Sequence, residues 1–106
     1  MDGEEAYRLG LVSELYPSQD LVSRCVDRAS ELARFSAPMS MALSKHLLWE
    51  NTGIRAMQAR ENVLFDWLAV QPDAEEGVAS FLEKREPRWH MSVSKDFPHH
   101  LLKDTL

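Results

Sequence analysis

A chain of 106 residues, with 44% hydrophobic and 27% charged residues, is long enough for one small globular domain. Its formal net charge of -5 at pH 7 argues against a nucleic-acid partner, because phosphate binding needs clustered Lys and Arg side chains and here they alternate with acidic ones. No apolar run suggests a membrane span, and the acidic start is unlike a signal peptide, so we expect a cytoplasmic protein.

The first half of the chain predicts two helical segments joined by an extended link. Residues 2–9 are acidic first and basic last and are followed by Gly10, which is typical of the last turns of a helix. After the extended run 11–16, Ser18 can cap a helix to about Phe35, and we expect its apolar face to be buried. That face comprises Leu21, Val22, Cys25, Val26, Ala29, Leu32 and Ala33.

Two further helices are expected in the middle of the chain. Ser36 can cap a helix with proline in its first turn that runs to about Glu50, and the longest helix covers residues 54–70 after a break at 51–53. The longest helix is apolar on more than one side. Phe65 and Trp67 therefore indicate contact with something beyond the neighbouring helix, either a missing part of the protein or another subunit.

A last helix is predicted from the spacing of Asp73 and Glu76, which is that of a capping box. Lys84 and Arg85 would place positive charge at its carbonyl end, where the helix dipole favours it, and Pro87 would end it. A narrow apolar stripe would comprise Val78, Phe81, Leu82 and Arg85.

Metal or thiol chemistry has little support in this sequence. Cys25 is the sole cysteine, which excludes an internal disulfide and a thiolate metal cluster, and we expect it to be buried and inert. His99 and His100 are neighbours, so on a helix they would face about 100° apart and could not both bind one metal. We predict no metal site.

Three stretches follow one another in a fixed order: G-L-V-S-E-L-Y-P at 10–17, A-P-M-S-M-A-L-S-K-H-L-L at 37–48, and E-G-V-A-S-F-L-E-K-R-E-P-R-W at 76–89. Together they resemble the C-terminal helical region of the enoyl-CoA hydratase/isomerase (crotonase) superfamily, with Lys45 as the matching lysine of the second stretch. Taken by itself, Lys45 is expected to be a solvated helix residue.

The resemblance implies an all-α fold of about five helices that lacks the ββα spiral core of the superfamily. Residues 1–89 would be the crotonase-like C-terminal helical domain, with an incomplete first helix, and 90–106 a C-terminal extension. In that extension, Phe97, Leu101 and Leu102 would either dock as a short helical turn or stay mobile.

The parent enzymes implied by the resemblance act on acyl-CoA thioesters in fatty acid metabolism, as hydratases, isomerases or hydrolases. Their oxyanion hole and, in hydratases, a pair of glutamates belong to the spiral core upstream. We find no counterpart of either here. We therefore assign no catalytic residue and no cofactor, acyl-CoA being the substrate of the parent family, and expect the chain alone to be inactive.

Two positions match residues that approach the nucleotide end of coenzyme A in relatives, commonly on an adjacent subunit. Phe65 matches an aromatic of the long helix, whose ring can cover adenine, and Lys84 matches a lysine of the E-K-R run, whose ammonium can pair with phosphate. The alternative is that Phe65 belongs to the core and Lys84 only complements the helix dipole.

Self-association as a dimer or trimer is the partner interaction that we expect, with acyl-CoA bound only in the context of a full-length protein. The competing hypothesis is an independent helical module that binds itself or a partner and has no acyl-CoA chemistry.

Overall fold

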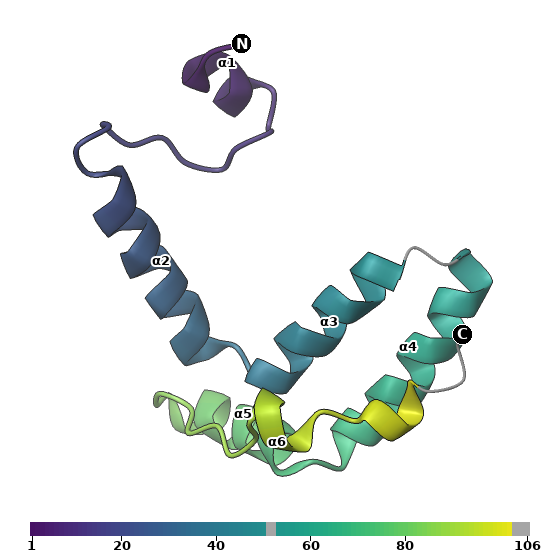
Figure 1. Cartoon of the computed structure of the whole chain (residues 1–106). Helices are drawn as coiled ribbons and strands as arrows, with labels where there is room; N and C mark the ends of the chain where they lie inside the picture. Colours follow the sequence, from purple (N-terminus) through teal and green to yellow (C-terminus); the bar gives the residue numbers. More distant parts are fainter. Residues whose placement is uncertain (51–52, 103–106) are drawn as a thin grey trace. The chain divides into compact units, whose positions relative to one another are not determined.

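The computed structural model describes residues 1–50 and 53–102, and over these residues the chain is all-α (Figure 1). The break predicted at 51–53 lies outside the described residues except for Gly53, which precedes the longest helix. None of the described helices is both long and apolar enough to cross a membrane. The elements are α1 (Gly3–Arg8), α2 (Leu21–Phe35), α3 (Pro38–Glu50), α4 (Ile54–Ala69), α5 (Pro72–Glu83), α6 (Val93–Asp96) and a 3-10 turn, η1 (His99–Leu101).

The chain divides into two compact units, Met1–Leu32 and Ala33–Leu106. In the first unit, α1 begins at a true cap, because the Asp2 carboxylate accepts a hydrogen bond of 2.8 Å from the amide of Glu5. It ends as predicted at Gly10, whose φ of 74° is left-handed. The amide of Gly10 donates to Tyr7 and that of Leu11 donates to Ala6, which is the Schellman pattern.

Helix α2 departs from the prediction in two ways. It begins at Leu21, because residues 18–20 form a turn, so Ser18 is not its cap. None of its residues is buried: the side chain of Val26 is 58% exposed, and Cys25 is exposed, contrary to the buried thiol that we expected. The expected burial of its apolar face is therefore not found among the described residues.

The core of the second unit lies between α3 and α4. Met39 and Leu43 of α3, Leu64 of α4 and Met91 after α5 are its buried apolar residues. Trp67 is partly buried and packs against this core, whereas the sequence had suggested contact with a missing part of the protein or another subunit. The partly buried side chains around the core are those of Leu47, Trp67, Leu68, Phe97, Leu101 and Leu102.

The segment after α5 returns to this core, and Figure 1 shows its yellow ribbon with α6 beside α3. Phe97, Leu101 and Leu102 pack on the buried cluster, and Pro98 is fully buried just before η1. Of the two alternatives for the extension, docking is therefore confirmed as far as residue 102. The prediction for residues 103–106 lies outside the described part of the chain.

The capping box predicted at Asp73 is wrong. Helix α5 begins at Pro72, with Gln71 as the cap residue. Proline is well suited to the first position of a helix, because the amide hydrogen that it lacks would have no partner within the helix. Asp73 is instead buried, and its Oδ1 accepts hydrogen bonds from the amides of His90 at 2.6 Å and Met91 at 3.3 Å. Asp73 thus anchors the segment that follows α5.

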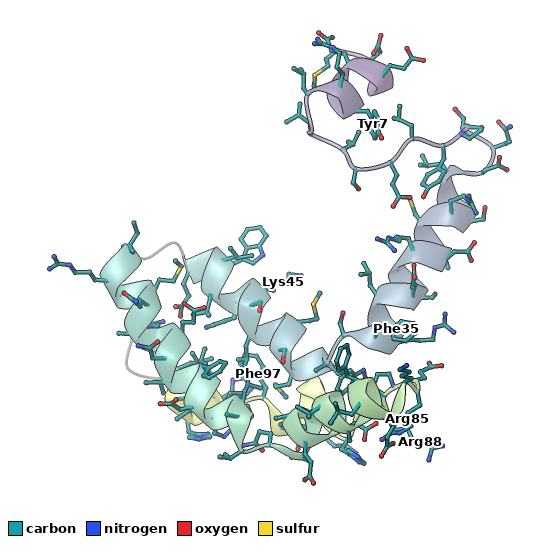
Figure 2. The ribbon with its side chains drawn as sticks, turned by 180° about the vertical axis from the view of Figure 1, so that it is seen from behind. Tyr7, Phe35, Lys45, Arg85, Arg88 and Phe97 are labelled. Carbon is teal, nitrogen blue, oxygen red and sulfur yellow. The ribbon has the colours of Figure 1, made fainter. Side chains whose placement is uncertain are left out.

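Glu76, the other half of the predicted box, binds the residues that follow α5. Its carboxylate accepts two hydrogen bonds from Arg85, at 2.5 and 3.0 Å, and one of 2.6 Å from the amide of Arg88. Figure 2 shows Arg85 and Arg88 close together beyond the end of α5. Arg85 is therefore outside the helix and not on its apolar stripe.

These contacts predict a pH dependence of stability. Hydrogen bonds from Arg85, and then from the Arg88 amide, lower the pKa of Glu76 from 4.5 to about 2. A carboxyl group whose pKa is lower in the folded state adds stability above its unfolded pKa, and this stability is lost as the pH falls through the folded value. We expect the denaturant midpoint to fall between about pH 5 and pH 2, and Glu76→Gln to remove that part of the fall.

Glu83→Gln is the matched control, since Glu83 also contacts Arg85 but its side chain is more exposed. Urea titrations at a series of pH values measure all three proteins. If Glu76→Gln kept the full pH dependence of the wild type, the Glu76 contacts would not be its source.

Candidate functional site

A groove with a volume of about 980 Å³ lies between α3, α4 and α5. Leu43 and Leu64 of the core form part of its lining, and Phe65, Val78 and Leu82 add exposed apolar side chains from α4 and α5. Helix α3 packs on α4 and α4 packs on α5, and the apolar side chains of α5, those of Val78, Phe81 and Leu82, stay exposed. This groove is the candidate site.

Phe65 is the predicted site residue that the structure places at the groove. Its side chain is 68% exposed, so the alternative that it belongs to the core is wrong. Phe65 follows the buried Leu64 directly, and successive residues on a helix point about 100° apart. An exposed aromatic ring beside a groove is a surface on which a flat apolar group can stack.

Lys84, the second predicted site residue, lies elsewhere on the same unit. It is the exposed C-cap residue of α5, with φ 54° and ψ 42°, and it does not line the groove. Its left-handed backbone is uncommon for a residue other than glycine. Phe65 and Lys84 therefore do not line the same groove, although both side chains are accessible.

The polar lining of the groove is acidic. Glu61 and Glu75 line it and make no hydrogen bond or ion pair with any described residue, whereas the nearby Asp73 is engaged with backbone amides. Among the described residues no Lys or Arg lines the groove, and Lys45 is solvent-exposed on α3, as expected (Figure 2). The groove thus favours apolar or cationic groups and disfavours phosphate.

A second polar cluster, which the sequence analysis missed, ties α3 to α4. The Glu50 carboxylate contacts Arg60 and lies 3.1 Å from Nε2 of His46, and its other oxygen is buried without a partner. The i, i+4 spacing of His46 and Glu50 was visible in the sequence, but their convergence with Arg60 needs the packing of two helices. Among the described residues, no group of three or more His, Cys, Asp or Glu side chains is arranged to hold a metal ion.

The sequence of this chain is similar to those of a known enzyme family. The family model described as enoyl-CoA hydratase/isomerase matches residues 1–92. The 2,3-dehydroadipyl-CoA hydratase of Escherichia coli K12 is 35% identical over 86 residues, which are 79% of this chain and 33% of that protein. The probable enoyl-CoA hydratase EchA12 of Mycobacterium tuberculosis H37Rv is 34% identical over 92 residues, which are 82% of this chain and 32% of that protein.

Solved structures of enoyl-CoA hydratases/isomerases share the fold of this chain. A probable enoyl-CoA hydratase/isomerase from Mycobacterium abscessus superposes with a TM-score of 0.79 at 29% sequence identity, covering 87% of this chain and 37% of that one. The chain spans about a third of the length of the curated relatives that it matches.

Proposed function

The chain belongs to the enoyl-CoA hydratase/isomerase family, and from that premise we propose that it is the C-terminal helical part of a protein acting on acyl-CoA thioesters. The observation that carries the proposal is the family match over residues 1–92 by a chain that spans about a third of its relatives. In this proposal the helices contribute self-association, as a dimer or trimer, and the edge of a coenzyme A site. The cytoplasm remains our prediction for its location.

We propose further that the chain has no hydratase activity by itself. Its sequence has no counterpart of the oxyanion-hole segment or of the paired glutamates, and removing even one oxyanion donor typically lowers a rate by about a hundred- to a thousandfold. We expect crotonyl-CoA to be hydrated no faster with the chain than in buffer alone. A turnover in the ordinary enzyme range, about 1 to 1,000 per second, would contradict this prediction.

For the coenzyme A site, we propose that Phe65 stacks on the adenine and Lys84 pairs with a phosphate. Because Lys84 does not line the groove and the carboxylates of Glu61 and Glu75 do, the phosphates would lie outside the groove, near the end of α5. The exposure of both side chains supports the proposal.

Calorimetric titration with coenzyme A at millimolar concentration tests these roles. We expect weak binding that Phe65→Ala reduces about tenfold, since a base stacked on an aromatic ring contributes about 1 to 3 kcal/mol. Lys84→Ala is expected to weaken binding in a salt-dependent way, because it removes a charge pair. Lys45→Ala, which removes another exposed lysine of the same unit, is the control and is expected to leave binding unchanged.

The second candidate function is an independent helical interaction module. The uncovered apolar face of α2 and the acidic lining of the groove favour it, since neither feature serves a thioester or a phosphate. Under this alternative coenzyme A does not bind, or binds equally well to the wild type and to Phe65→Ala. The same titration therefore separates the two functions.

A further inference from the structure

The chain reverses its direction at Lys84, directly after the end of α5. Beyond this residue, the amide of Arg88 donates a hydrogen bond to Glu76, near the middle of the helix. The amide of His90 then donates to Asp73, near the start of the helix. The segment after α5 therefore runs back along it, and Lys84 is exposed at the point of reversal.

Lys84 makes this reversal in a backbone conformation that glycine usually adopts. The amide of Lys84 donates to Phe81 and that of Arg85 donates to Ser80, which together form a Schellman motif around the left-handed φ of 54°. At the end of α1, the same motif has glycine at this position, Gly10. A side chain disfavours the left-handed region, so a lysine stays there only where its surroundings hold it.

The carboxylate of Glu76 supplies that support. It accepts two hydrogen bonds from the Arg85 guanidinium, at 2.5 and 3.0 Å, and one from the amide of Arg88 at 2.6 Å. We call these three contacts the Glu76 clamp. The side chain of Glu76 is only 11% exposed, and two parallel bonds from one guanidinium fix both distance and orientation. The clamp thus holds the reversed chain immediately after Lys84.

Arg85 also shapes the charge around Lys84. Its Nε donates to Glu83 at 2.5 Å, so one guanidinium engages the carboxylates of both Glu76 and Glu83. The ammonium of Lys84 has no ion pair with any described residue. Arg85 therefore occupies acids that would otherwise compete for this lysine, and the charge of Lys84 stays available to an anion.

We propose that Glu76 and Arg85 are positioning residues that hold Lys84 in place for a phosphate of coenzyme A. Neither of them contacts the phosphate; they act through the backbone and the surroundings of Lys84. A cation that is already held in place loses less conformational freedom on binding, which favours affinity. This inference rests on the proposed contact between Lys84 and a phosphate. It leaves the role of Phe65 unchanged, because Phe65 lies on α4.

Calorimetric titration of Glu76→Gln with coenzyme A tests the positioning role. The substitution removes a negative charge, so simple electrostatics would tighten the binding of a phosphate. We expect the opposite, binding weakened about two- to fivefold and by as much as in Lys84→Ala. Glu86→Gln is the matched control, since its exposed carboxylate has no described partner and lies two residues from Lys84. It should bind as tightly as the wild type or slightly more tightly.

Combined substitutions distinguish positioning from a general loosening of the fold. Glu76→Gln with Lys84→Ala should bind no more weakly than Lys84→Ala alone, because both changes remove the same contact. Glu76→Gln with Phe65→Ala should still bind about tenfold more weakly than Glu76→Gln, because stacking is independent of the clamp. Arg85→Lys keeps the charge but loses the two parallel bonds, and it should weaken binding in the same direction as Glu76→Gln.

Two kinds of result would overturn the proposal. If Lys84→Ala weakened binding while Glu76→Gln bound like Glu86→Gln, the positioning role would fall and the proposed coenzyme A contact would stand. If the wild type did not bind coenzyme A, or Lys84→Ala bound as the wild type does, both would fall. Far-ultraviolet circular dichroism checks that each variant is folded. Should Glu76→Gln lose its helical signal, Arg85→Lys decides the question by the same comparison.

Discussion

Replacing Leu43 with alanine is expected to lower the free energy of unfolding of the second unit by about 2 to 5 kcal/mol. Leu43 is 2% exposed at the centre of the contact between α3 and α4, beside Met39 and Leu64. Truncation removes buried methyl groups and leaves a cavity that its neighbours fill only in part. Because small domains are stable by only about 5 to 15 kcal/mol, this is the largest effect that we expect from one substitution.

Urea titration followed by tryptophan fluorescence measures this effect, since Trp67 packs on the same core. Leu48→Ala is the matched control: it is the same change on the same helix, at a side chain that is 79% exposed, and it should alter stability by no more than about 0.5 kcal/mol. Equal effects of the two substitutions would mean that α3 does not pack through Leu43.

Replacing Asp73 with alanine should cost about 1.5 to 3 kcal/mol, the range for hydrogen bonds to a charged group. The substitution removes the acceptor for two backbone amides, those of His90 and Met91, and leaves the buried Met91 amide without a partner. We expect the segment after α5 to loosen while α5 itself keeps its helical start, because Gln71 and Pro72 set that start. Asp73→Asn keeps one acceptor oxygen and should lose less.

Amide hydrogen exchange locates the effect of Asp73→Ala. Faster exchange at residues 90 and 91, with the first turn of α5 unchanged, is the expected result. Faster exchange confined to the first turn of α5 would instead support the capping role that the spacing of Asp73 and Glu76 first suggested.

Much of the helical architecture could be predicted from the sequence, because its signals are local. Gly10, after a segment that is acidic first and basic last, correctly predicted the end of α1. The apolar periodicity predicted the bounds of α2 to α5 to within a few residues. The start of α5 could not be found from the Asp73 spacing alone. That carboxylate is used by amides 17 and 18 residues away, a contact that depends on the path of the chain after α5.

The candidate site was predicted only in part, for similar reasons. Phe65 and Trp67 are two residues apart, so on one helix they point about 200° apart and cannot both face outward from the same core. The structure assigns Trp67 to the core and Phe65 to the groove. Glu61 and Glu75, whose carboxylates have no partner among the described residues, come from two helices, and their common position beside one groove is a property of tertiary packing.

Our central proposal is that this chain is a helical part of a larger assembly and buries its uncovered apolar faces against another copy. Light scattering behind size exclusion, over a hundredfold dilution series at micromolar concentration, tests it most directly. Soluble monomers rarely expose large contiguous apolar patches, and an interface of about 1,600 Å² is ordinary for a specific complex. We expect a mass two or three times the 12.2 kDa of one chain. A compact particle of 12.2 kDa at every dilution would contradict the claim.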